Sequence, residues 1–102
     1  MITRFTTPPI TLLVKGVNIT AYDIYVTVKQ DDNEITVSDG LSVSLEGSDT
    51  KIVFQLTQEQ AGSLDFRGFA GVQVNWIADG NRYATEIARV QIYNNLFDEV
   101  IE

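Results

Sequence analysis

Hydrophobic and polar residues alternate along much of this chain. A first extended stretch covers residues 10–17, and a clearer one covers residues 22–30. Side chains at every second position of a strand share one face, so a period of two indicates strands with one buried face. The apolar positions of the second stretch are Tyr22, Ile24, Val26 and Val28. The pattern predicts an all-β protein.

The segment after residue 30 predicts a hairpin with a defined register. A two-residue loop at Asp31-Asp32 pairs Val28 with Ile35, which keeps the apolar positions of both strands on one face. The same register sets Lys29 opposite Glu34, and such an opposite-charge pair contributes about 0.2–1 kcal/mol. Charge and hydrophobicity therefore agree on this hairpin.

A second hairpin is expected near residue 48. A two-residue loop at Ser48-Asp49 pairs Val43 with Phe54 and sets Glu46 opposite Lys51. This register again satisfies both the apolar pattern and the charges.

The segment Ser38-Asp39-Gly40 allows two interpretations. A three-residue loop aligns Val37 with Leu41 and places Gly40 in the left-handed conformation that such loops require. Alternatively, the chain crosses here from one sheet to another.

The strongest hairpin signal is Asp79-Gly80, a preferred type I′ turn that pairs Trp76 with Tyr83. Beyond Ile87 the apolar positions change parity. This change predicts either a β-bulge near Ala88 or a strand that switches its buried face.

About seven short strands, with turn signals about every eight to twelve residues, predict an immunoglobulin-like antiparallel β-sandwich. A closed barrel is the alternative. Thr57 and Gln60 have the spacing of a capping box, which predicts a helical turn over about residues 58–64. The length of 102 residues suits one domain. We expect the sandwich over residues 1–95 and a docking tail over residues 96–102.

Composition argues against catalysis. The chain has no histidine and no cysteine, which removes the usual nucleophile–base pairs, zinc ligands and disulfides. Acidic residues fall mainly at predicted turns, so a hydrolase with paired carboxylates is disfavoured. We expect no enzyme activity and no cofactor.

Charge and hydropathy limit the partners. The net charge of −7 disfavours binding to nucleic acid. No apolar stretch has the length needed to span a membrane, and the N-terminus lacks the apolar core of a signal peptide. We therefore expect synthesis in the cytoplasm and no membrane association.

The sequence contains two candidate binding sites, and each also has a structural interpretation. Residues 31–34, with Asp79 or Asn81 from another loop, offer oxygen ligands for calcium, but a hairpin tip explains them better. Aromatic residues such as Trp76 and Tyr83 suggest a carbohydrate platform, although core packing accounts for most of them. No metal is expected.

The apolar residues predicted to face outward favour a role in protein–protein contacts. Outward parity selects Tyr25, Val53 and Ile77, which would form a contact surface if they lie together.

The C-terminus offers a second contact element. Asn94 or Asn95 is a candidate cap for a short helix with an apolar face. So short a helix requires docking, either on its own sandwich or on another subunit. The residues of this face are Leu96, Phe97, Val100 and Ile101.

Four segments carry a resemblance to a known group of proteins. They are residues 22–30 (YDIYVTVKQ), 54–60 (FQLTQEQ), 71–76 (GVQVNW) and 87–96 (IARVQIYNNL). Together they resemble small tailed-bacteriophage or prophage proteins, and the layout is similar to the N-terminal β-sandwich domain of phage upper-baseplate proteins. The resemblance implies a virion, tail or baseplate structural protein that is synthesised in the host bacterial cytoplasm. It also implies contacts with other phage structural proteins, assembly as a homo-oligomer, and no catalytic residues. The alternative function is a carbohydrate-binding module that recognises a host cell surface.

Overall fold

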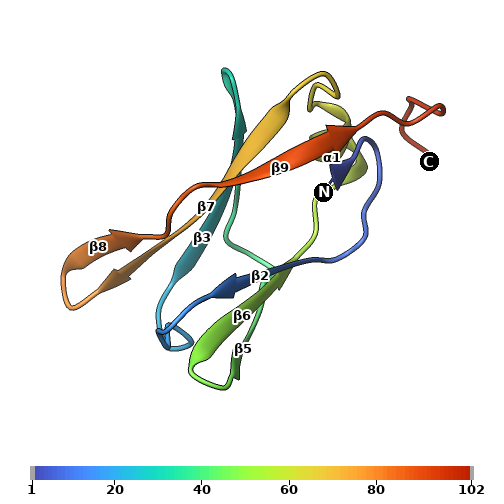
Figure 1. Ribbon diagram of the computed structural model, residues 1–102. Coiled ribbons are helices and arrows are strands. Elements are labelled where there is room, and N and C mark those ends of the chain that lie inside the picture. The colour runs from blue at the N-terminus through green and yellow to red at the C-terminus, as the bar shows by residue number, and fades with distance from the viewer. Residues whose placement is uncertain (1, 102) are drawn as a thin grey trace.

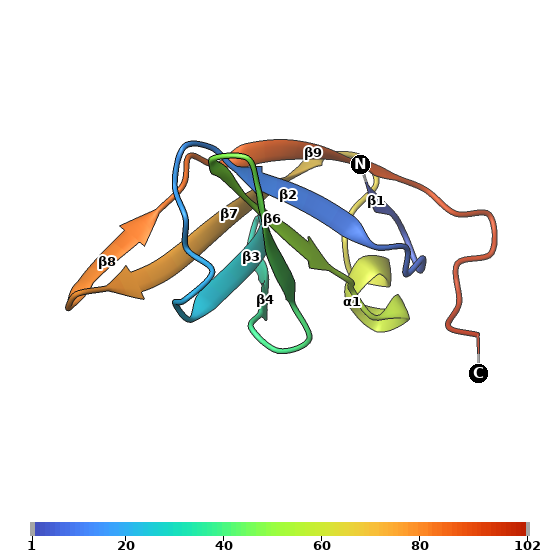
Figure 2. The same cartoon turned by 90° about the horizontal axis from the view of Figure 1, so that it is seen from below.

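The computed structural model describes residues 2–101, which form two packed β-sheets and one short helix. Met1 and Glu102, at the outer ends of the predicted domain and tail, lie outside the described residues. The division at residue 95 stays a prediction. Figure 1 shows the arrangement of the elements, and Figure 2 shows the two layers from below. The elements are β1 (Ile2–Thr3), β2 (Ile10–Val14), β3 (Ile24–Gln30), β4 (Asn33–Val37), β5 (Ser42–Glu46), β6 (Asp49–Phe54), α1 (Gln58–Gly62), β7 (Phe69–Ala78), β8 (Asn81–Ala84) and β9 (Ala88–Tyr93).

The strand order is that of an immunoglobulin-like sandwich. One sheet has the order β1-β9-β7-β3-β4, with β8 also paired to β7, and the other has the order β2-β6-β5. These orders correspond to G-F-C-C′ and B-E-D of the immunoglobulin fold, with β1 added beside β9. The predicted sandwich is confirmed. One pairing departs from the antiparallel prediction, because β1 runs parallel to β9.

Two predicted hairpins have the expected register. In the β3–β4 hairpin Val28 lies opposite Ile35 and Lys29 opposite Glu34. In the β7–β8 hairpin Trp76 pairs with Tyr83. The β7–β8 turn has positive φ at both central residues, 53° at Asp79 and 80° at Gly80, as a type I′ turn requires.

Two strands are shorter than predicted. The first extended stretch forms a strand only as far as Val14, and the second begins at Ile24. Tyr22 therefore precedes β3, in a turn where its backbone N–H donates to the Ile19 carbonyl, and its side chain is exposed. Because Tyr22 lies outside β3, the alternation along the strand does not determine which way its side chain points.

The predicted register of the β5–β6 hairpin is wrong by two residues. Val43 pairs with Ile52 instead of Phe54, and Lys51 lies opposite Ser44 instead of Glu46. Gly47 has a φ of 64°, so the loop uses glycine for the left-handed position. A shift of two residues keeps every side chain on its predicted face.

The segment at residues 38–40 is a crossing between sheets. β4 belongs to the six-stranded sheet and β5 to the three-stranded sheet, so Val37 does not pair with Leu41. Gly40 has a φ of 71°, the left-handed conformation expected for it.

The predicted bulge interrupts the last strand. Asn75 pairs with Ala84 and Val72 with Ala88, so four steps along one strand match three along the other. The extra residue lies between β8 and β9 and moves Ile87 onto Gly71, where a Cβ would meet Ile87 Cγ2 at 2.9 Å. The glycine makes room for the bulge.

The helical turn forms as predicted, but the C-terminal helix does not. Thr57 and Gln60 make both bonds of the capping box, and the helix ends at Gly62, two residues before its expected end. Asn95 Oδ1 does accept from the Phe97 backbone N–H, as a cap would. No helix follows in the described part of the tail, since the cost of nucleating one turn is not recovered over so few residues.

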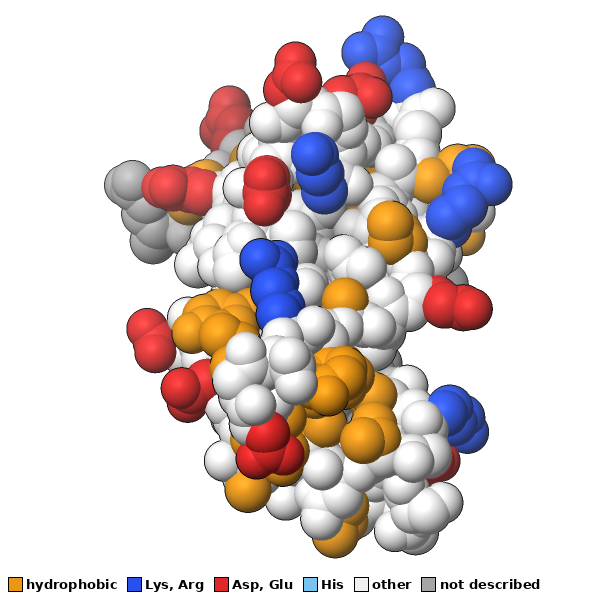
Figure 3. All heavy atoms as spheres, turned by 90° about the vertical axis from the view of Figure 1, so that its left-hand side faces the viewer, with side chains coloured by type: hydrophobic (Ala, Val, Ile, Leu, Met, Phe, Trp, Pro, Cys, Tyr) orange, Lys and Arg blue, Asp and Glu red, His pale blue; other side chains and the backbone are white. Residues whose placement is uncertain are grey.

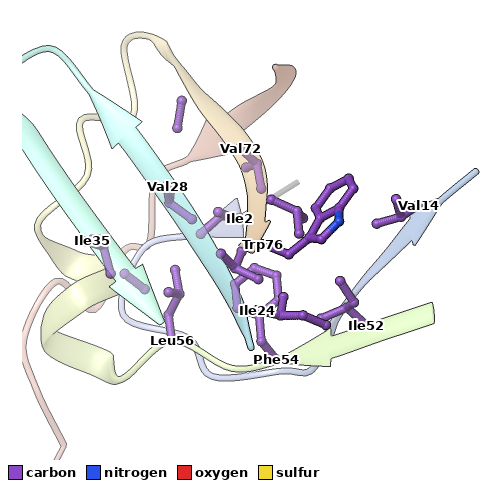
Figure 4. Packing of buried hydrophobic residues seen from close by; sticks show 14 of the residues in the cluster. Ile2, Val14, Ile24, Val28, Ile35, Ile52, Phe54, Leu56, Val72 and Trp76 are labelled. Atoms are coloured by element: carbon purple, nitrogen blue, oxygen red, sulfur yellow. The ribbon is translucent and has the colours of Figure 1, made fainter. Parts of the chain in front are cut away.

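The core lies between the sheets. Phe54 and Ile52 of the three-stranded sheet face Val26, Val28 and Trp76 of the six-stranded sheet, and all are buried. Figure 4 shows Trp76, Ile52 and Phe54 among the packed side chains.

Acid is expected to weaken the loop between β2 and β3. Asp49 Oδ1 accepts from the Gly16 backbone N–H at 2.8 Å, and Lys15 Nζ lies 3.5 Å from Asp49 Oδ2. The Gly16 bond and the Lys15 charge hold the pKa of Asp49 below its ordinary value of 3.8. The ionised carboxylate thus stabilises the fold above about pH 4, and this contribution is lost as the pH falls through the folded-state pKa.

The measurement is thermal unfolding of wild type and Asp49→Asn from pH 7 to pH 3. The wild type should be more stable at pH 7, and the difference should shrink on acidification. Asp39→Asn controls for net charge. A difference that stays constant over this pH range would contradict the prediction.

Candidate functional site

The outer face of the six-stranded sheet carries a shallow hollow that includes two predicted contact residues. Tyr25 of β3 and Ile77 of β7 point away from the core, with 39% and 53% of their side chains exposed. They line a depression of about 340 Å³, which we call the outer-face hollow. Its lining residues are Tyr25, Thr27, Glu34, Thr36, Asn75, Trp76, Ile77 and Arg82.

Polar contacts order the side chains of the hollow. Arg82 Nε donates to Asn75 Oδ1 at 3.2 Å, and the hydroxyls of Thr27 and Thr36 lie 3.1 Å apart. Arg82 is opposite Ile77 in the β7–β8 ladder, so its guanidinium stands beside an exposed apolar side chain. The hollow thus combines an apolar centre with hydrogen-bonding groups.

Lysine and arginine side chains occur on this face beside several carboxylates, such as that of Asp31. Lys29 and Arg89 flank Gly71 on neighbouring strands, and the Arg89 guanidinium lies 4.4 Å from the centre of the Phe69 ring. Within residues 2–101, neither residue nor Arg82 is within ion-pairing distance of a carboxylate. Figure 3 shows the side on which β8 lies, where hydrophobic side chains gather in the lower half, among and below Lys and Arg.

The sequence pattern did not identify the polar members of the hollow. Arg82 and Asn75 carry no motif, and only the hairpin register shows that they share the outer face with Ile77. Once Asp79-Gly80 sets the pairing of Trp76 with Tyr83, the outward position of Arg82 follows.

Val53, the third outward residue, lies elsewhere. It belongs to β6 and pairs with Thr11 and Ser42, in the three-stranded sheet. Because its neighbours Ile52 and Phe54 point into the core, Val53 faces the opposite side of the sandwich from Tyr25. One flat partner surface cannot contact all three residues.

The C-terminal segment is tethered but exposed. We call residues 96–101 the tail. Gln58 of α1 binds both backbone groups of Ile101: its Nε2 donates to the carbonyl at 2.9 Å, and its Oε1 accepts from the N–H at 2.7 Å. Asn95 Nδ2 donates to the Arg4 carbonyl at 3.0 Å. All four predicted contact residues are exposed, and Leu96 is exposed completely.

Gln58→Ala is expected to release the end of the tail. Both hydrogen bonds to Ile101 are lost, whereas the sandwich core does not involve this side chain. Amide hydrogen exchange at Ile101 should accelerate, with a change in the free energy of unfolding of no more than about 0.5 kcal/mol.

Glu59→Ala, on the same helix, is the matched control and should leave this exchange rate unchanged. Equal exchange at Ile101 in wild type and Gln58→Ala would show that Gln58 does not hold the tail.

The carboxylates of the described residues do not form a metal site. Among residues 2–101 there is no group of three or more Asp or Glu side chains placed to hold an ion. Asp31 and Asp79 occupy left-handed positions in hairpin turns, with φ of 52° and 53°. This placement agrees with their interpretation as turn residues. No helix of the described residues is long and apolar enough to cross a membrane.

Comparison with known proteins shows only a distant similarity to solved structures. No protein-family model and no curated protein matches the chain. Among solved structures, a chimeric titin Z1Z2 functionalized with a KLER exogenous peptide from decorin is similar over 93% of this chain and 87% of that chain. The sequence identity is 19% and the TM-score 0.42. The immunoglobulin-like assignment therefore rests on the strand order of the protein itself.

Proposed function

We propose that the protein is a non-enzymatic structural and assembly module of a phage virion, acting at the tail or baseplate through protein–protein contacts. Its partners are other phage structural proteins and further copies of itself. The phage setting is supported by the resemblance of residues 22–30, 54–60, 71–76 and 87–96 to tailed-phage proteins.

One observation carries the assembly role. The tail presents Leu96, Phe97 and Ile101 to solvent while Gln58 and Asn95 hold its backbone. Exposed apolar groups that lie together mark sites of protein contact, because burying them on binding is favourable. A segment that is already positioned loses less conformational freedom on binding.

The virion role is tested by mass spectrometry of purified particles. Particles induced from a host that carries this gene should contain the chain at a constant multi-copy ratio to the major structural proteins. Presence only in the soluble lysate, with none in the particles, would reject the virion role.

The outer-face hollow supports a second candidate, a carbohydrate-binding module. Asn75, Glu34 and Arg82 offer hydrogen bonds to sugar hydroxyls, and Tyr25 supplies an aromatic ring beside them. Glycan arrays with and without chelator test this function. Specific glycan binding that is lost in Tyr25→Ala would favour it over assembly.

A further inference from the structure

We infer that the tail of one molecule docks into the outer-face hollow of a second copy, so that the protein assembles head to tail. This inference rests on the proposed role in protein contacts, and it names the partner and both contact surfaces. It is independent of whether the assembly belongs to a virion.

The tail holds apolar side chains at the surface. Its backbone is fixed by Gln58 at one end and by Asn95 at the other, yet its apolar side chains are exposed. Leu96 and Phe97 therefore project from an anchored backbone. Such groups act as anchors when a partner provides a matching depression.

The outer-face hollow has the composition of a contact site. It presents the side chains of Tyr25 and Ile77, with Arg82 beside them. Tyrosine and arginine are among the residue types that contribute most to protein interfaces. The surrounding threonine, asparagine and glutamate side chains form a polar rim, as interfaces commonly have.

Arg82 gives the hollow a specific electrostatic match to the tail. Among residues 2–101 it is not within ion-pairing distance of a carboxylate, and it lies opposite the exposed Ile77. The tail carries Asp98 and Glu99 between its apolar residues, and either carboxylate can pair with Arg82 when the tail docks.

The tail and the hollow lie far apart on one molecule. The molecule is 44 Å long, and the turn between β7 and β8 lies at the opposite end from the tail in both Figure 1 and Figure 2. The tail is tied to α1, so it cannot reach the hollow of its own molecule. A contact between two different surfaces of identical molecules is heterologous and repeats into a ring or an open chain.

Sedimentation velocity of the full chain tests the contact. The wild-type mass should rise with concentration beyond that of a dimer. Two variants, Leu96→Ser/Phe97→Ser in the tail and Ile77→Arg in the hollow, should each lower the association constant by about 30-fold or more. Leu45→Ser is the matched control, since Leu45 is 52% exposed, close to the 53% of Ile77, but lies on β5. It should associate like wild type, and circular dichroism should show that every variant is folded.

Mixing the two variants separates a head-to-tail contact from a symmetric one. Each variant alone has one defective surface, whereas a mixture still offers one intact tail and one intact hollow. We expect a complex with one copy of each variant and no larger species.

Charge exchange adds a second check on the same pair of surfaces. Arg82→Glu should weaken association, and combining it with Asp98→Arg should restore it.

Three outcomes would overturn the inference: a wild-type protein that stays monomeric at all concentrations, a discrete symmetric dimer, or a variant mixture that forms no complex. A monomer found in virions would reject self-docking and leave the virion role intact. A head-to-tail polymer absent from virions would do the reverse.

Discussion

Replacing Phe54 by alanine is expected to lower the free energy of unfolding by about 3–5 kcal/mol. Phe54 is the largest fully buried side chain, at 1% exposure, and it projects from β6 against the six-stranded sheet. Truncation removes the transfer free energy of the ring and leaves a cavity that the two sheets fill only in part. Chemical denaturation measures the loss.

The same substitution at an exposed phenylalanine provides the control. Phe66 lies in the loop between α1 and β7 and is exposed, so Phe66→Ala should change the free energy of unfolding by no more than about 0.5–1 kcal/mol. Equal losses in the two variants would contradict the packing of Phe54 between the sheets.

Thr50→Val is expected to cost about 2–4 kcal/mol, although the two side chains have nearly the same shape. Thr50 is fully buried, and its hydroxyl joins the β2–β3 loop to β6. The hydroxyl donates to the Val17 carbonyl at 2.7 Å and accepts from the Ile19 backbone N–H at 3.1 Å. Valine leaves both backbone groups without this partner, and each unmet buried group costs about 1–3 kcal/mol.

Thr36→Val separates this effect from that of the substitution itself. Thr36 is exposed on β4, where its hydroxyl faces that of Thr27 at 3.1 Å. Water replaces the lost bond there, so the change should stay within about 0.5 kcal/mol. If Thr50→Val were equally mild, the hydroxyl would not be what holds the loop.

Phe54→Ala and Thr50→Val change the core and not the two surfaces proposed for assembly. Phe54 packs behind β3 and β7, the strands that carry Tyr25 and Ile77 on their outer faces. Both variants leave the outer-face hollow and the tail unchanged in sequence. While folded, they should therefore associate like wild type, which separates core defects from interface defects.

The local sequence determined the strands, their faces and the hairpins whose loops have special chemistry. Asp79-Gly80 fixed the pairing of Trp76 with Tyr83, because a type I′ turn places the residues on either side directly opposite each other. The outward direction of Tyr25 and Ile77 also followed from parity alone, since side chains alternate along a strand. The capping box of Thr57 and Gln60 likewise determined where α1 begins.

Where the local pattern allowed more than one strand register or connection, only the tertiary structure showed which one forms. The apolar pattern of β5 and β6 repeats every two residues, so it accepts a register shifted by two. Only the structure shows that Gly47, with its positive φ, lies in the loop between them. Likewise, the crossing at residues 38–40 depends on which sheet buries each strand, which no short segment specifies.

The tail and the hollow depended most on contacts far apart in sequence. Gln58 binds Ile101 across 43 positions, and these bonds satisfy its carbonyl and also its backbone N–H, which the predicted helix would have used. Arg82 joins Tyr25 in the outer-face hollow only because β7 pairs with both β3 and β8. Alternation determines which way a side chain points, but strand pairing determines which side chains it meets.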